Sequence, residues 1–119
     1  MTYRDNISRL RHILDAVENA VLFTKDKQRR DMETNKMLAF ALVRLLEIIG
    51  EAAHGISEDL KQKYPAVPWQ QMTSMRNNLI HGYFQVDNDL IWQTVKKELP
   101  PLLTAIRDIL QKENKDSDA

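Results

Sequence analysis

The stretch MLAFALVRLLEIIGEAAHG (residues 37–55) decides the fold class, because its apolar residues recur at spacings of three and four. Such spacing places them on one face of an α-helix, where they can be buried against the rest of the chain. We predict that this helix ends near Gly55. Its apolar stripe consists of Met37, Ala41, Leu45, Ile48 and Ala52.

Two further stripes with the same period lie on either side of this stretch. One predicts a helix over about residues 3–24, followed by the polar turn KDKQRRD (residues 25–31), and the other predicts a helix in the last third of the chain. No alternating strand pattern competes with these helices. The first stripe consists of Ile7, Leu10, Leu14, Val17 and Val21. The last consists of Trp92, Val95, Leu99, Leu103, Ile106 and Leu110.

Residues with capping chemistry divide the region between these stripes. Ser57 is expected to cap a short helical turn, and Asp87 is expected to cap the last helical segment. Pro68 suits the first position of a helix, where its missing N–H group costs nothing. That helix is expected to run to His81, and Gly82 lets the chain leave it.

Together these elements predict an all-α, up-and-down bundle of four to five helices. Pro100 and Pro101 both lack the N–H group that bonds one turn back, so they should kink or break the last helix. We expect a single domain over residues 1–112. Residues 113–119 are polar and are expected to form a frayed tail.

Composition excludes several functional classes. The chain has 119 residues and a formal net charge of zero, so contact with nucleic acid must be local. It has no cysteine, which excludes disulfides, cysteine-based zinc sites and thiol catalysis. No apolar run approaches the roughly 18 residues of a membrane span, and the N-terminal residues have no signal-peptide core. We expect a soluble cytoplasmic domain with no membrane association.

The stretch RNNLIHGYF (residues 76–84) gathers an arginine, a histidine and a tyrosine at one predicted helix end. No Asp or Glu occurs between Leu60 and Val86, whereas Lys61, Lys63 and Arg76 fall inside this window. A locally positive patch of this kind favours a phosphodiester ligand. A purely structural interpretation also remains open: Arg76 extends along the surface, His81 caps the helix and Tyr83 packs on the bundle.

The sequence offers little for a metal or a cofactor. The three histidines, His12, His54 and His81, lie on different predicted elements and form no zinc-binding spacing. Phosphate-binding glycine loops and serine-hydrolase elbows are also absent, so we expect no cofactor. Glu47 and Glu51 lie one helical turn apart near Arg44. They fit a solvated set of ion pairs, and a supporting role for Glu51 near an active site is the alternative.

The motifs, taken in order, resemble those of HepT proteins, which belong to the HEPN class of helical ribonucleases. The resemblance runs from the first helix to Leu110, and its most specific element is the R-x4-H-x-Y pattern of Arg76, His81 and Tyr83. It implies an endoribonuclease toxin that needs no metal, with Arg76 and His81 as catalytic residues. It also implies a nucleotidyltransferase antitoxin similar to MntA, which attaches AMP to Tyr83. The segments that carry the resemblance are IIGEAA (48–53), YPAVPWQQM (64–72), RNNLIHGYF (76–84), VDNDLIW (86–92) and KKELPPLL (96–103).

The residue chemistry is compatible with RNA cleavage. Histidine titrates near neutral pH and can act as acid or base, and an arginine fork can hold a phosphate through two hydrogen bonds. Asn77, next to Arg76, could orient either the fork or the phosphate. On an ideal helix, Arg76 and His81 point about 140° apart, so a turn at Gly82 or a two-fold dimer would have to bring them together.

The resemblance favours the dimer, because the active cleft of the HEPN class lies between two protomers. We therefore expect a homodimer or a larger even assembly. Two other interpretations stay open: a non-catalytic helical adaptor that binds a nucleotidyltransferase, and a plain bundle without a site. The identity of the RNA is also open, with transfer RNA suggested by family analogy alone.

Overall fold

The computed structural model describes residues 3–81 and 87–118, with side chains described for residues 5–79 and 87–114. All regular structure in these ranges is helical, which confirms the predicted all-α class. None of the helices formed by these residues is both long and apolar enough to cross a membrane. The elements are α1 (Tyr3–Thr24), α2 (Asp31–Thr34), α3 (Lys36–Gly55), α4 (Glu58–Lys63), α5 (Trp69–His81), α6 (Asn88–Gln93), the π-helical segment η1 (Thr94–Glu98) and α7 (Leu99–Asp118).

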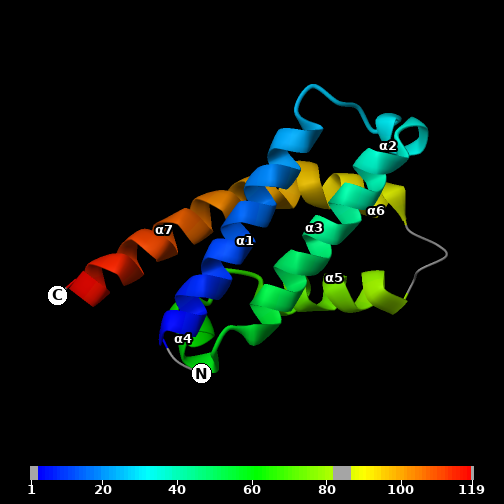
Figure 1. The fold of residues 1–119 in the computed structure, drawn as a ribbon. Coiled ribbons are helices and arrows are strands. Elements are labelled where there is room, and N and C mark those ends of the chain that lie inside the picture. Colours follow the sequence, from blue (N-terminus) through cyan, green and yellow to red (C-terminus); the bar gives the residue numbers. More distant parts are fainter. Residues whose placement is uncertain (1–2, 82–86, 119) are drawn as a thin grey trace.

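Helix α3 lies at the centre of the molecule. It packs against α1 on one side and against α5 on another, while α7 packs against α1 (Figure 1). The chain reverses between α1 and α3 through α2, and α5 crosses below α3 before the chain returns along α6, η1 and α7 (Figure 1). One apolar core joins these helices. Its most deeply buried members include Leu10, Ile13, Val17, Leu42, Ile91, Val95 and Ile106.

Side-chain caps begin the helices at or near the predicted positions. The Ser57 hydroxyl accepts a hydrogen bond from the backbone N–H of Leu60 at 3.3 Å, at the start of α4. The Asp87 carboxylate accepts one from the backbone N–H of Leu90 at 3.1 Å, at the start of α6. The carbonyl of Pro68 accepts the first bond of α5, so this proline lies one residue before the helix, not inside its first turn.

The phase predicted for α3 is wrong by one residue along most of the helix, where the buried residues are Leu38, Leu42, Leu46 and Ile49. Met37, assigned to the buried stripe, is 82% exposed, whereas Leu38 is 6% exposed. Helix α3 packs mainly against α1 and α5 and also contacts α2 and α6, so it needs apolar residues on several faces. The spacing alone therefore does not decide which of them are buried. The side chain of Asn35 fixes where α3 begins by accepting a hydrogen bond from the backbone N–H of Leu38 at 3.1 Å.

The interruption expected at Pro100 and Pro101 takes the form of a π-helical segment immediately before them. The backbone N–H of Leu99 donates to the carbonyl of Thr94, five residues back. Pro100 and Pro101 have no backbone N–H and cannot donate α-helical hydrogen bonds. The wider π-helical turn before them accommodates this loss. Helical structure therefore continues from α6 through η1 into α7.

The segment predicted to be a frayed polar tail begins inside α7, which extends to Asp118. Glu113 is buried in spite of its charge. Its carboxylate accepts hydrogen bonds from the Lys63 ammonium at 2.9 Å and from the Tyr64 hydroxyl at 2.6 Å. These contacts attach the C-terminal part of α7 to the last residue of α4 and to the residue that follows it.

Candidate functional site

Arg76 projects from α5 opposite Gly50 of α3, where the two helices lie very close together. A Cβ atom added to Gly50 of α3 would lie 2.2 Å from the Cβ of Arg76 and 2.7 Å from the carbonyl oxygen of Met72. Only a residue without a side chain permits this approach. This close contact holds the Cβ of Arg76 against α3.

The guanidinium group of Arg76 is only partly engaged. Its Nη1 donates to the Oδ1 of Asn77 at 2.9 Å, which is the contact expected if Asn77 orients the fork. Its Nε is buried and has no hydrogen-bond partner among the described residues. An unsatisfied buried donor costs about 1–3 kcal/mol. Native structures rarely leave such a donor without a partner.

His81 is the last residue of α5, and the helix is unbroken between it and Arg76. Five residues of α-helix correspond to a rise of about 7.5 Å and a net rotation of about 140°. The two positions therefore lie on different faces of α5, as the sequence predicts. The side chain of His81 and the whole of Tyr83 lie outside the described part of the structure.

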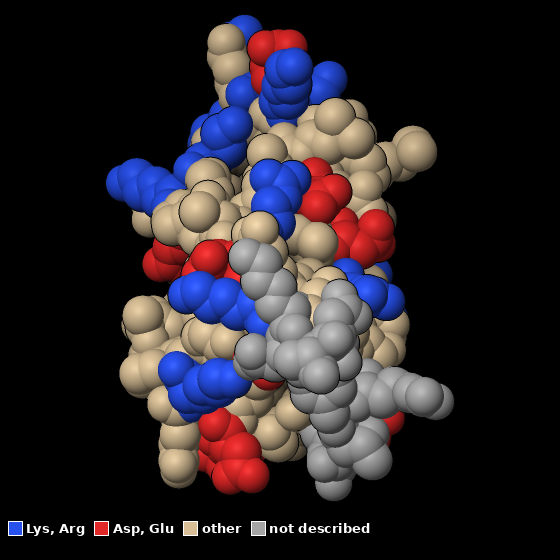
Figure 2. Space-filling model, turned by 90° about the vertical axis from the view of Figure 1, so that its left-hand side faces the viewer, with Lys and Arg blue, Asp and Glu red and all other residues tan. Residues whose placement is uncertain are grey.

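The region between Leu60 and Val86 offers less free positive charge than its composition indicates, because both of its lysines pair with glutamates. Lys61 pairs with Glu58 at 3.8 Å, and Lys63 pairs with Glu113 at 2.9 Å. Among Lys61, Lys63 and Arg76, only Arg76 forms no ion pair within the described ranges. Its charge is therefore available to a ligand. On the face of the molecule shown in Figure 2, lysine and arginine side chains are interleaved with acidic ones, as expected for a chain without net charge.

Glu51 takes part in the ion-pair arrangement expected for it. Arg44 lies 3.3 Å from Glu47 and 3.8 Å from Glu51. Glu51 also lines a polar groove between α1 and α3 together with Arg9 and His12. The structure therefore brings Glu51 to Arg44, and it places no described contact between Glu51 and Arg76. Over the described residues, no group of three or more His, Asp or Glu side chains is placed to hold a metal ion.

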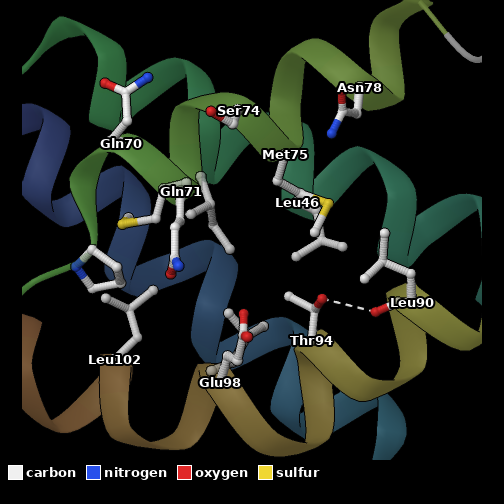
Figure 3. Close-up of a pocket in the computed structure, with 14 residues that line it drawn as sticks. Leu46, Gln70, Gln71, Ser74, Met75, Asn78, Leu90, Thr94, Glu98 and Leu102 are labelled. Atoms are coloured by element: carbon white, nitrogen blue, oxygen red, sulfur yellow. Dashed lines mark hydrogen bonds between the residues drawn. The ribbon is translucent and has the colours of Figure 1, made fainter.

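A cavity on the other side of α5 was not anticipated from the sequence. Its volume is about 360 Å³, and it lies between α3, α5 and the helical run from α6 to α7 (Figure 3). The polar residues of α5 that line it recur with helical spacing, and this was the signal available in the sequence. They are Gln70, Gln71, Ser74 and Asn78.

Comparisons with known proteins agree with the resemblance drawn from the motifs. The family model described as ribonuclease HepT-like matches residues 13–109. A candidate RNase of Methanocaldococcus jannaschii is 42% identical over 102 residues, which cover 86% of this chain and 94% of that protein. A probable ribonuclease HepT of Thermococcus cleftensis is 43% identical over 93 residues, which cover 78% of this chain and 84% of that protein.

A candidate RNase of Caldanaerobacter subterraneus is 40% identical over 104 residues, which cover 87% of this chain and 93% of that protein. No solved structure matches the chain significantly. The matching family model and the relatives both extend over most of the sequence. The chain therefore belongs to the HepT-like ribonuclease family.

Proposed function

We propose that this chain is an endoribonuclease that cuts RNA without a metal ion, with Arg76 and His81 as its catalytic residues. Family membership supports the reaction class. The observation that carries the assignment of Arg76 is its partly engaged guanidinium, which hydrogen-bonds to Asn77 and forms no ion pair with an acidic residue in the described structure. Such a cation is suited to an anion that the protein itself does not supply.

The reaction follows from the chemistry of RNA. The ribose 2′-oxygen attacks the adjacent phosphorus, and the bond from phosphorus to the 5′-oxygen breaks. The 2′-hydroxyl proton passes to a base, and the leaving oxygen receives a proton. His81 is assigned to this proton transfer, because an imidazole titrates near neutral pH. Arg76 is assigned to the charge that develops on the phosphate oxygens, and Asn77 holds its fork.

This mechanism predicts products that end in a 2′,3′-cyclic phosphate and a 5′-hydroxyl. The test is cleavage, in EDTA, of an RNA oligonucleotide and of a matched oligonucleotide with one 2′-deoxy nucleotide at the cut position. We expect cleavage of the first at that position and none of the second there. Equal cleavage of both substrates would exclude the 2′-oxygen as nucleophile. A chain that cuts neither substrate, yet binds a nucleotidyltransferase, would be the adaptor.

We further propose that the enzyme is the toxin of a toxin–antitoxin pair and that a nucleotidyltransferase silences it at Tyr83. In that step the phenol oxygen bonds to the α-phosphorus of ATP, its proton is released, and pyrophosphate leaves. The support is the spacing of Tyr83, two residues after His81. An AMP group there would bring negative charge to the place where an RNA phosphate must bind, and it would compete for Arg76.

The test of this proposal is the variant Tyr83→Phe, incubated with the nucleotidyltransferase, ATP and magnesium. We expect it to cut RNA normally and to gain no AMP by intact-mass measurement. An adduct on the Phe variant would place the modification elsewhere. A Phe variant that no longer cuts RNA would make Tyr83 part of the catalytic site.

A further inference from the structure

The cavity beside α5 has the properties of a small-molecule site. Its volume of about 360 Å³ falls within the range of about 300–1,000 Å³ that such sites occupy. Its apolar lining comes from α3, α5, α6 and α7, and a π-helical segment forms part of its wall. Segments of this kind are frequent at functional sites. The apolar residues are Leu46, Ile49, Pro68, Met72, Met75, Leu90, Leu99 and Leu102.

The charge of the lining limits what can occupy the cavity. No lysine, arginine or histidine is among the described residues that line it, and Glu98 is the acidic residue there. A phosphate group would therefore meet a carboxylate and no cation. The occupant should be flat or apolar on its faces and should carry hydrogen-bond donors on an edge.

Two polar side chains extend into the cavity from opposite walls. Gln71 extends into the cavity from α5, and Glu98 extends into it from η1 (Figure 3). Neither side chain hydrogen-bonds to another residue in the described parts of the chain. The Thr94 hydroxyl, in contrast, is already engaged, because it donates to the carbonyl of Leu90 at 2.8 Å. Gln71 and Glu98 are both exposed to solvent, so a ligand that enters the cavity can reach their polar groups.

The cavity lies along α5 from the proposed catalytic histidine. Gln70, Ser74 and Asn78 all line it, and position 81 continues their row at helical spacing. Asn78 precedes His81 by about 4.5 Å of helix rise. The cavity is therefore next to the face of α5 on which position 81 lies, and it is turned away from Arg76.

We propose that this cavity binds a nucleobase of the RNA substrate, with Glu98 as the residue that selects guanine. The inference rests on the proposed ribonuclease function. Guanine presents two neighbouring donors on its base-pairing edge, N1–H and the N2 amino group, and one carboxylate can accept both. Gln71 can donate its amide N–H to the guanine O6. The sulfurs of Met72 and Met75 can contact the aromatic faces of the base.

The methionine methyl groups provide a direct test that does not depend on cleavage. Protein labelled with ¹³C at these methyls is titrated with guanosine, adenosine, cytidine, uridine or inorganic phosphate and followed by NMR. We expect guanosine to shift the signals of Met72 and Met75, while the exposed Met37 serves as the internal control. The other nucleosides should bind at least tenfold more weakly, and phosphate should cause no shift at the cavity.

Glu98→Gln should weaken guanosine binding at least tenfold, because it loses a charge-assisted bond and replaces an acceptor with a donor. Glu58→Gln, at an exposed glutamate of α4, is the matched control and should bind normally. The proposal is wrong if no nucleoside shifts Met72 and Met75, or if Glu98→Gln binds guanosine as the parent does. It is also wrong if none of the nucleosides shifts these signals but an added nucleotidyltransferase does. A chain that binds guanosine but cuts no RNA would refute the proposed function instead.

Discussion

Arg76 is packed against α3 at its Cβ, and its guanidinium is only partly hydrogen-bonded within the described structure. Its Cβ packs where Gly50 brings α3 and α5 together, and its Nη1 bonds to Asn77. Its Nε has no described partner. A planar fork held in this way can form two hydrogen bonds to a phosphate with little loss of side-chain entropy.

Replacement of Arg76 by lysine tests whether the fork matters or only its charge. Arg76→Lys keeps the positive charge and loses the planar donor pair. We expect kcat for RNA cleavage to fall by at least about a hundredfold, the size typical for loss of one donor to transition-state charge. Single-turnover cleavage measures the effect. If the lysine variant cuts at the parental rate, Arg76 supplies only a charge.

Gly50 should act as a positioning residue for Arg76. Gly50→Ala puts a methyl group against the Arg76 Cβ and the Met72 carbonyl, so α5 must move away from α3. We expect the variant to lose about 1–3 kcal/mol of unfolding free energy and at least tenfold in kcat. The changes are measured by urea denaturation and by cleavage below the unfolding transition.

Gly55→Ala is the matched control in the same helix. A Cβ there meets the distal atoms of the Arg9 side chain, which can rotate aside. We expect its cleavage to match the parent. In an Arg76→Lys background, whose residual cleavage can still be measured, Gly50→Ala should cause a smaller loss than it causes in the parent. Independent, multiplicative losses would show that Gly50 acts on something other than Arg76.

The spacing of Arg76 and His81 at a helix end makes both residues predictable from the sequence. The role of Gly50 could not be predicted, because the contact that requires a glycine forms between α3 and α5, whose residues are far apart in the chain. The cavity was missed for the same reason. Its walls come from α3, α5 and the run from α6 to α7, and the spacing of polar residues along α5 does not by itself show that these elements enclose a cavity.

At the scale of the helices, capping residues gave the most accurate predictions. Ser57 and Asp87 form the bonds expected of them, because a cap is satisfied within one turn of its own helix. Met37 was assigned wrongly, because α3 is apolar on several faces and its phase depends on two neighbouring helices. Local signals therefore located the helix ends better than the buried face.

Helix α7 should depend on Glu113 for its attachment to the bundle. Glu113→Ala removes the acceptor of the Lys63 ammonium and the Tyr64 hydroxyl, and we expect a loss of about 1–3 kcal/mol in unfolding free energy. Asp108→Ala, which breaks an exposed ion pair with Lys112 in the same helix, should cost less than about 0.5 kcal/mol. Thermal denaturation compares the two variants. Equal stability would show that Glu113 contributes no more than a surface charge.

At the scale of the whole molecule, the positions of Arg76 and His81 favour a site built by two protomers. They lie about 140° apart on one unbroken helix, so a two-fold axis offers a way to bring one protomer's Arg76 to the other protomer's His81. We therefore expect a dimer or a larger even assembly by light scattering at micromolar concentration.

Mixed dimers test the shared site. Arg76→Ala and His81→Ala protein are each expected to be inactive, yet a mixed dimer of the two retains one intact pair. Mixing them after subunit exchange should restore about a quarter of the parental activity, since about half of the dimers are mixed and each carries one of two sites. An active monomer, or mixtures that remain inactive although mixed dimers form, would show that the site is not shared in this way.

Metal-independent cleavage by His81 is tested by the rate at which the purified chain cuts RNA in EDTA, compared with the rate of His81→Ala. The predicted result is cleavage by the parent and a loss of at least about a hundredfold in the variant, within the range that general acid–base catalysis contributes. Both proteins should unfold at the same temperature. A parent that leaves RNA intact would contradict the ribonuclease activity, and a folded His81→Ala variant that cuts within tenfold of the parent rate would remove His81 from the mechanism.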